Sequence, residues 1–363
     1  MPNPYAHGQP ADPVKEFAGR EEELRRVRSC VESSRAGHIT NVFIDGEWGI
    51  GKTSLLNKLR PELQERGPVI SEDLADSEEQ LVWFYSAMFS ELMEAEPHGV
   101  APELFDDLDV RDSRRIRKLL KGIWEGLRER AERYELVVIM LDNLERAQPD
   151  FLSGVRDVFQ RLAQEGARYM LIFAGKRLPV PEDTDASDPI GRFFNPRIVL
   201  RPLERAVSLE AIQKPVRFLP FSFADDAARL IHDRAAGHPY FLKLICHEIY
   251  DLAEGKAAVD VPRLEKLWPD VEDRLEAARF GGQFTKLPVG EQMTLLYASL
   301  LGPRFEAKEL RSVITKSLDT YLDRLVDKRE LVRSVSRGVY ELYHPLFRTY
   351  LQSKAREKRI RSA

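Results

Sequence analysis

The 363-residue sequence predicts an α/β domain with a parallel sheet, then a helical region, then a smaller module of helices and a β-hairpin. Up to about residue 202, apolar runs of strand length alternate with stretches of helical periodicity. This alternation indicates a parallel sheet with helices on both faces. From about residue 203 to 284 the pattern is helical, and from about 285 it changes again. A chain of this length suits two or three domains.

Composition indicates a globular protein. Hydrophobic residues make up 43% of the chain, enough for a sizeable core. The two cysteines, Cys30 and Cys246, fit neither a metal-ligand nor a redox spacing, and we expect them to be reduced core residues. The N-terminus lacks the features of a signal peptide, and the longest apolar run, Leu136 to Leu141, is too short to cross a bilayer. We therefore expect a soluble, cytoplasmic protein.

Charge is distributed unevenly along the chain. The net charge is −4, but residues 301–363 contain 15 Lys/Arg and 8 Asp/Glu, which gives +7 and leaves −11 for the first 300 residues. Such asymmetry suggests that the C-terminal part meets an anionic partner. The alternative is a solvated tail, because much of the excess lies in SKAREKRIRSA at the end of the sequence.

The N-terminal elements follow from local patterns. Residues 1–16 are rich in Pro, Ala and polar groups, which predicts a flexible segment. A helix is expected from about Arg20 to Ser33, because three glutamates occupy its first turn, where the helix dipole favours acids. The β-branched run at 39–44 predicts a strand, and a glycine-rich loop and a helix follow it.

Two fully buried parallel strands are expected in ELVVIMLDN and ARYMLIFAG, because both are continuous apolar runs. A last strand at 197–200 is expected to close the sheet. Helical stretches that connect the strands are expected around 78–95, 112–134 and 150–164.

The glycine-rich loop fits the pattern G-x4-G-K-[ST] at every fixed position, and it lies between a predicted strand and a predicted helix. Glycines allow backbone N–H groups to close around a β-phosphate, and the helix N-terminus adds positive potential. Lys52 is expected to reach the β- and γ-phosphates of ATP, and the Thr53 hydroxyl to bind Mg²⁺. The predicted nucleotide-binding residues here are Gly46, Glu47, Trp48, Gly49, Ile50, Gly51, Lys52, Thr53 and Ser54.

A carboxylate on a neighbouring strand is needed to hold the metal of such a site. The apolar run Leu136 to Leu141 ends in Asp142, which therefore emerges at the carboxyl edge of the sheet, where ligands bind in open α/β sheets. Asp142 is the predicted metal partner beside Thr53. The seven histidines form no cluster with metal-ligand spacing, so no metal other than nucleotide-bound Mg²⁺ is expected.

At this point the sequence resembles a known family. Phe17-Ala18-Gly19-Arg20-Glu21-Glu22-Glu23-Leu24 resembles the F-x-G-R-x-x-E-L box that opens many AAA+-related ATPases, above all the archaeal-type and STAND classes, with the initiator ATPases as relatives. Gly237-His238-Pro239 resembles the G-x-P motif of their helical lid, and Phe173-Ala174-Gly175-Lys176-Arg177 resembles their sensor position. ELYHPLFRTYL (341–351) resembles the close of a winged helix. The resemblance covers roughly residues 17–353.

The resemblance implies a parallel-sheet P-loop NTPase fold (AAA+/STAND-like) with a helical lid and a C-terminal winged-helix domain. The implied domains are 17–202, 203–284 and 285–353, followed by a basic tail at 354–363. By the same resemblance, further nucleotide contacts are expected from Phe17, Gly19, Arg20 and Pro239, and a catalytic sensor role from Arg177.

The sequence departs from the AAA+ pattern in two places. Typical members have a catalytic Glu directly after the metal-binding Asp, whereas this chain has Asn143 there and its nearest acid is Glu145. Glu145 is the predicted residue that orients the attacking water. The sensor strand also lacks the usual Asn or Thr. Both departures favour a slow nucleotide-gated switch over a fast motor.

Arg192 and Phe193 resemble the R-F box from which AAA+ proteins extend an arginine finger into a neighbouring subunit. Such a finger raises phosphoryl-transfer rates by ~10³–10⁵. A surface arginine without a catalytic role is the alternative, and Arg197 is the second candidate for the finger. A homo-oligomer is the implied state.

The C-terminal region reads as helices at 289–301, 306–314 and 317–327, then a hairpin at 331–343 and a closing helix, which indicates a winged helix. Arg333 and Arg337 on the wing are the predicted contacts to duplex DNA. Aspartates on the third helix argue against tight base readout, and the alternative is a module that binds protein, as in a STAND-type signalling or anti-phage defence ATPase.

Overall fold

The computed structural model describes residues 2–5, 8–95, 112–130, 135–176, 178 and 188–360. It divides into two compact units, which we describe separately. One comprises residues 10–201, and the other residues 202–360 together with the N-terminal residues up to Gln9. None of the described helices is long and apolar enough to span a membrane.

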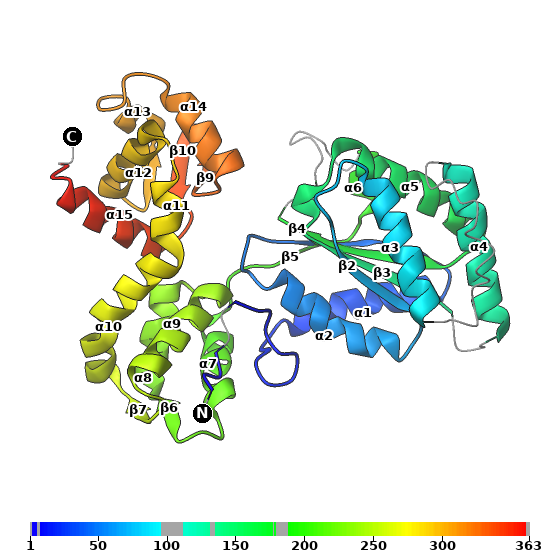
Figure 1. Ribbon diagram of the computed structural model, residues 1–363, viewed down its shortest axis with the longest axis horizontal. Coiled ribbons are helices and arrows are strands. Elements are labelled where there is room, and N and C mark those ends of the chain that lie inside the picture. The colour runs from blue at the N-terminus through cyan, green and yellow to red at the C-terminus, as the bar shows by residue number, and fades with distance from the viewer. Residues whose placement is uncertain are drawn as a thin grey trace. The chain divides into compact units, whose positions relative to one another are not determined.

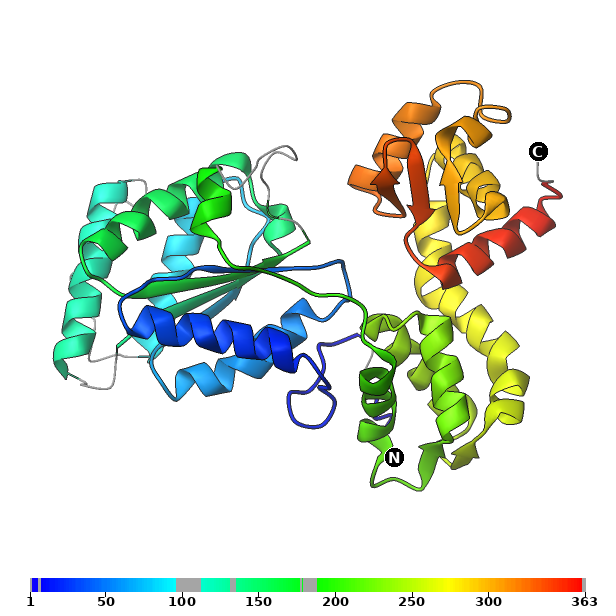
Figure 2. The same cartoon turned by 180° about the vertical axis from the view of Figure 1, so that it is seen from behind.

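The first unit is built on a five-stranded sheet with the order β2-β3-β4-β1-β5 (Figures 1 and 2). All strand pairs are parallel, which confirms the predicted fold class. Two strands, β3 and β4, are buried along their whole length, as their apolar runs predicted. The sequence did not indicate β2, whose residues VISED are mostly polar. The strands are β1 (Val42–Asp45), β2 (Val69–Asp73), β3 (Val137–Asp142), β4 (Tyr169–Gly175) and β5 (Arg197–Val199).

Helices cover both faces of this sheet. Successive strand residues point to opposite sides, so the apolar side chains of one strand contribute to a core on each face. Val42 and Ile44 of β1 pack in the core that includes α1 and α2, whereas Phe43 packs in the core that includes α3, α4 and α5. Figure 1 shows the two helical layers. The helices are α1 (Glu21–Arg35), α2 (Lys52–Gln64), α3 (Gln80–Ala95), α4 (Ser113–Arg130), the 3₁₀ turn η2 (Leu144–Arg146), α5 (Pro149–Gln164) and α6 (Pro189–Phe193).

The second unit begins with a helical part and a short two-stranded sheet, β6-β7. Its last helix continues through a π-helical turn into α11 and so leads into the C-terminal part. The elements are α7 (Arg205–Gln213), the 3₁₀ turn η3 (Lys214–Val216), β6 (Phe221–Phe223), α8 (Asp225–Ala235), α9 (Pro239–Leu252), β7 (Ala257–Val259), α10 (Val261–Leu275), η4 (Glu276–Phe280) and α11 (Gly281–Thr285).

The C-terminal part has the element order expected of a winged helix: helix, strand, two helices, hairpin, helix. Its sheet has the order β8-β10-β9, with antiparallel pairs. The sequence did not indicate the short strand β8. The elements are α12 (Val289–Leu301), β8 (Arg304–Glu306), α13 (Ala307–Leu310), α14 (Leu318–Asp323), the π-helical turn η5 (Arg324–Lys328), β9 (Val332–Ser336), β10 (Val339–Leu342) and α15 (Pro345–Glu357).

The N-terminal segment differs from the flexible stretch that its composition suggested. Tyr5 is 1% exposed and belongs to the core of the second unit. The Tyr5 hydroxyl donates to the carbonyl oxygen of Ile212, and the backbone carbonyl oxygen of Tyr5 lies 2.6 Å from Nδ1 of His247. Asn3 adds a hydrogen bond to the His247 carbonyl at 3.0 Å. One buried aromatic ring thus anchors this segment, a non-local effect that a composition argument does not register.

The helical part and the C-terminal part share one hydrophobic core. Phe241 of α9 lies against the His344 ring, with ring centroids 3.9 Å apart, and Phe280 stacks on Tyr350 at 5.7 Å. The Nε2 of His344 is 2.9 Å from the carbonyl oxygen of Ala235 in α8, and its Nδ1 accepts from the backbone N–H of Leu346. His344 therefore caps α15 and joins the two parts at once.

Burial lowers the pKa of His344 to about 4; the charge of Arg333 also lowers it, and the hydrogen bond to Ala235 opposes them. An unfolded histidine titrates near pH 6.5, so the unfolded state binds the proton more readily. The contribution of neutral His344 to stability is full above pH 7, and about 3 kcal/mol of it is lost between pH 6.5 and 4. In His344→Asn, which keeps a capping acceptor, urea unfolding should depend less on pH across this window. The exposed His38→Asn is the control, and equal slopes in both variants would contradict the assignment.

Candidate nucleotide site

The G-x4-G-K-[ST] loop lies between the end of β1 and the start of α2, as predicted. Gly51 has φ of 101°, a left-handed conformation that residues with a Cβ rarely adopt, and it immediately precedes the helix. At Gly46 a Cβ would lie 2.6 Å from Ile50 Cγ2 and 3.3 Å from Leu200 Cβ. Glycine at these positions lets the backbone close into a tight loop, and its N–H groups lie at a helix N-terminus that attracts anions.

Lys52 is the first residue of α2 and its side chain folds back onto the loop. It is 8% exposed, and its Nζ donates to the carbonyl oxygens of Gly46 at 2.7 Å and Glu47 at 3.1 Å. An ammonium group has three donor directions, so these two bonds hold the charge beside the loop backbone. The lysine is thus positioned where the loop would surround a phosphate group.

Thr53 and Asp142 are in contact although β1, the strand before the loop, and β3, the strand that ends in Asp142, are not adjacent in the sheet. The Thr53 hydroxyl donates to Oδ2 of Asp142, and the backbone N–H of Asn143 donates to Oδ1 at 2.8 Å. The sequence-based expectation placed Asp142 on a strand neighbouring the loop's own strand. That expectation was wrong, because β4 lies between β1 and β3. Contact is possible because α2 begins over the carboxyl edge of the sheet, where all the parallel strands end.

Asp142 is buried, and a second acid lies close to it. The residue is 3% exposed, and burial raises the pKa of its carboxyl group. Hydrogen bonds from Thr53 and Asn143 and the charge of Lys52 partly offset this rise, and the nearby Asp73 adds to it. Asp73 ends β2 directly opposite Asp142, so it is a second acid at this edge. The sequence analysis missed it because it missed β2. A hydroxyl and carboxylates are hard oxygen donors of the kind that Mg²⁺ prefers.

Glu145 lies in the turn η2, three residues after Asp142, and its side chain reaches the end of β4. Its Oε2 accepts from the backbone N–H of Lys176 at 3.2 Å. Asn143, which occupies the position of the usual catalytic glutamate, has φ of 60°. Asparagine tolerates this left-handed conformation better than glutamate does. The chain therefore turns sharply after Asp142, and its next acid is directed towards the end of the sensor strand. Arg177, the predicted sensor arginine, lies outside the described residues.

The F-x-G-R-x-x-E-L box contacts the loop through Arg20. Its Nη2 donates to the carbonyl oxygens of Ile50 at 3.1 Å and Arg201 at 2.7 Å, and Nη1 pairs with Glu23 at 3.1 Å. Burial lowers the pKa of the Arg20 guanidinium, and Glu23 opposes this shift. Phe17 is 8% exposed in the core beside α2, and Gly19 has φ of 66°. These contacts position the loop from outside. Direct nucleotide contact by Phe17, Gly19 and Arg20 stays a prediction.

The remaining predicted residues differ in the exposure of their side chains and in their ion pairs. Arg192 is exposed on α6, and no side-chain ion pair involves it within the described part of the chain. Arg197, the second finger candidate, pairs with Asp45 and lies over the Phe43 ring, so its charge is already engaged. Pro239 begins α9 in the second unit, and its role towards nucleotide stays a prediction.

Of the two wing arginines, only Arg337 is exposed. It lies at the tip of the hairpin between β9 and β10. Arg333 is half-buried, and its charge acts on Tyr343 and His344 in the core of the module. DNA contact by Arg333 and Arg337 stays a prediction.

Comparison with known proteins agrees with this geometry. Residues 16–173 match the AAA ATPase domain family. The matched region, which contains the phosphate loop and Asp142, is an AAA ATPase domain. No curated protein sequence matches it.

Solved structures share the fold of this ATPase across nearly the whole chain. A Walker-type ATPase from Pyrococcus abyssi has a TM-score of 0.65 at 17% identity, covering 95% of this chain and 98% of that one. The Aeropyrum pernix ORC2 protein, solved with ADPNP and ADP, has a TM-score of 0.59 at 15% identity, covering 99% of both chains. The Aeropyrum pernix ORC1 protein, solved in complex with DNA, has a TM-score of 0.52 at 19% identity, covering 98% of both.

Arg20→Ala in this ATPase should lower the free energy of unfolding of the first unit by about 2 kcal/mol, because it leaves the Ile50 and Arg201 carbonyls without a charged donor. Arg25→Ala, on the helix α1 that follows Arg20, is the matched control. Arg25 pairs with Glu22 at the surface, so its loss should cost under about 1 kcal/mol. Urea unfolding of both variants measures the difference. Equal losses would contradict the view that Arg20 supports the phosphate loop.

Proposed function

We propose that this ATPase is a slow, nucleotide-gated switch that binds Mg²⁺ and ATP at the 46–54 loop. The observation that carries the proposal is the contact between Thr53 and Asp142 beside Lys52 at one sheet edge. In the proposal, the loop backbone and Lys52 hold the phosphates, while Thr53 and Asp142 hold the metal. Bound Mg²⁺ supplies positive charge that offsets the charge of the transferring phosphoryl group.

Glu145 is the proposed residue that positions the attacking water. Its contact with Lys176 N–H fixes the carboxylate at the end of β4. A site that orients water from three residues beyond the metal ligand, with no acid directly after Asp142, supports slow turnover suited to a switch. Arg192 is the proposed arginine finger between subunits, since it is exposed and lacks an ion pair in the described part of the chain. Restored turnover on mixing Arg192→Ala with Lys52→Ala protein tests that role.

Two substitutions separate binding from turnover. Lys52→Ala should lose most ATP affinity, because it removes the loop's cation. Glu145→Gln should bind ATP like the wild type but hydrolyse it at least tenfold more slowly, a barrier increase of about 1.4 kcal/mol. Fluorescent-nucleotide titration and phosphate release measure the two quantities, and circular dichroism controls for folding. Wild-type binding in Lys52→Ala would sink the loop assignment. Wild-type turnover in Glu145→Gln would place the water-orienting group elsewhere.

A second proposed function is weak binding of duplex DNA by the C-terminal module. Its support is the charge of +7 on residues 301–363 and the exposed cations at the wing tip and the end of α15. The exposed cations are Arg337, Arg356, Lys358 and Arg359. On the third helix, Asp319 already pairs with Arg311, and its acids repel the DNA backbone. The contacts are therefore to phosphates, with little sequence preference.

The double variant Arg337→Glu/Lys358→Glu should weaken binding of labelled duplex at least tenfold at about 50 mM salt, because each neutralised phosphate contributes to counterion release. The log–log salt slope should also fall by about 0.9 per lost contact. Lys266→Glu on α10, exposed and outside the module, is the control. Fluorescence anisotropy measures all three proteins. Absent binding in the wild type, or indifference to the double charge reversal, would favour a module that binds protein.

A further inference from the structure

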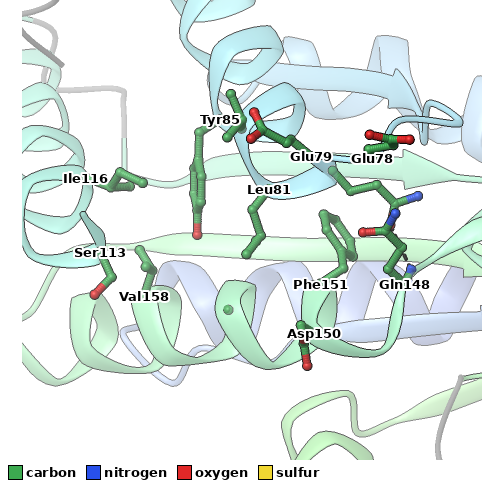
Figure 3. Close-up of a pocket in the computed structure, with 13 residues that line it drawn as sticks. Glu78, Glu79, Leu81, Tyr85, Ser113, Ile116, Gln148, Asp150, Phe151 and Val158 are labelled. Atoms are coloured by element: carbon green, nitrogen blue, oxygen red, sulfur yellow. Dashed lines mark hydrogen bonds between the residues drawn. The ribbon is translucent and has the colours of Figure 1, made fainter. Parts of the chain in front are cut away.

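A cavity of about 290 Å³ lies between α3, α4 and α5, on the sheet face opposite α1 and α2 (Figure 3). It is separate from the phosphate loop, since no residue of 46–54 lines it. The walls are apolar and mostly buried, whereas the polar side chains at its edge are exposed. The apolar wall residues are Leu81, Val82, Ile116, Phe151 and Val158; the exposed polar residues are Glu78, Glu79, Ser113, Gln148 and Asp150.

Tyr85 places a hydroxyl in this cavity, and Figure 3 shows its side chain directed into the space. The residue is 2% exposed, and its hydroxyl has no hydrogen-bond partner within the described part of the chain. By contrast, the equally buried Tyr169 hydroxyl donates to the Leu120 carbonyl at 2.6 Å. A buried polar group without a partner costs about 1–3 kcal/mol, so a ligand that satisfies it gains affinity.

The Tyr85 hydroxyl is neutral, because burial and the nearby charge of Asp157 hold its pKa well above the usual tyrosine value. A neutral phenol both donates and accepts one hydrogen bond. The matching ligand group is therefore a hydroxyl or another small uncharged polar group. The exposed acids Glu78, Glu79 and Asp150 line the edge of the cavity and give that edge a negative potential. The edge matches an ammonium group.

From this combination we propose that the cavity binds a small amine with a one-ring apolar body and a hydroxyl at the far end. The ring would lie between Leu81, Ile116 and Phe151, its hydroxyl at Tyr85, and its ammonium near Glu79 and Asp150. A volume of about 290 Å³ is at the lower end for small-molecule sites, which limits the body to a single ring. Each part of this ligand has a partner in the cavity: the apolar walls for the ring, the Tyr85 hydroxyl for the hydroxyl, and the acidic edge for the ammonium group.

The cavity is also connected to the Glu145 segment. Gln80 Nε2 donates to the Arg146 carbonyl at 2.8 Å, and Gln80 Oε1 accepts from the Gln148 backbone N–H at 2.7 Å. Both Gln80 and Gln148 line the cavity. A bound amine therefore contacts the residues that fix the segment after Asp142 and should change ATP turnover. This coupling rests on the proposed role of Glu145, whereas the binding itself does not.

The test uses tyramine as the probe, with 2-phenylethylamine lacking the hydroxyl and tyrosol lacking the ammonium. Methyl NMR titrations of the full chain follow Leu81, Ile116 and Val158. Tyramine should bind the wild type at least fivefold more tightly than either analogue. Tyr85→Phe should reduce that preference over 2-phenylethylamine to under twofold, and Glu79→Gln should reduce the preference over tyrosol. Glu125→Gln, an exposed acid of α4 outside the cavity, is the control.

Tyr85→Phe keeps the ring and removes only the unsatisfied hydroxyl, so its melting temperature should equal or exceed that of the wild type. No saturable shift at these methyls up to about 5 mM tyramine, or equal selectivity in wild type and Tyr85→Phe, would overturn the site. ATP turnover with and without saturating tyramine then tests the coupling. Turnover that tyramine leaves unchanged, with binding intact, overturns the coupling alone. Failure of the proposed ATPase mechanism would appear without any amine.

Discussion

The meeting of Thr53 and Asp142 at the carboxyl edge of the sheet is the constraint on which the nucleotide site depends. It requires β1 and β3 to end at the same level although β4 separates them, which a parallel sheet in register provides. It also requires α2 to begin immediately after the loop, which left-handed Gly51 permits. Arg20 then holds the loop from outside through the Ile50 carbonyl. The hydrogen bond between Thr53 and Asp142 therefore depends on the correct register of three strands and on the start of one helix.

The same edge explains why the first acid after Asp142 comes three residues later. The backbone N–H of Asn143 donates to Asp142, and Asn143 has a left-handed conformation that brings the chain into the turn η2. A glutamate at that position would be strained, whereas asparagine is tolerated. The acid instead appears at Glu145, against the end of β4. The proposed slow switch is thus consistent with the backbone geometry at Asn143 as well as with the identity of that residue.

Features encoded locally could be predicted from the sequence, and features that depend on distant contacts could not. The phosphate loop, Asp142 and the helix of 289–301 follow from spacing and periodicity within a short window. Strand β2 was missed because its polar residues lack a strand pattern and pairing with β3 alone defines it. The burial of Tyr5 depends on Ile212, over two hundred residues away. Likewise, Arg333 and Arg337 are both arginines of the predicted hairpin in the sequence, yet Arg333 is half-buried and Arg337 is exposed.

The shared core of the second unit determines what a switch of this kind can transmit. Phe241, Phe280 and His344 bury the junction between the helical part and the C-terminal module. Close packing of such side chains makes independent movement of the two parts costly. A displacement of the helical part would therefore carry the wing tip with it. The neutral state of His344 maintains this rigid connection, because protonation would place a charge in the core beside Arg333. The proposed nucleotide-dependent contact of the module with DNA or protein would then require no separate hinge between α11 and α15.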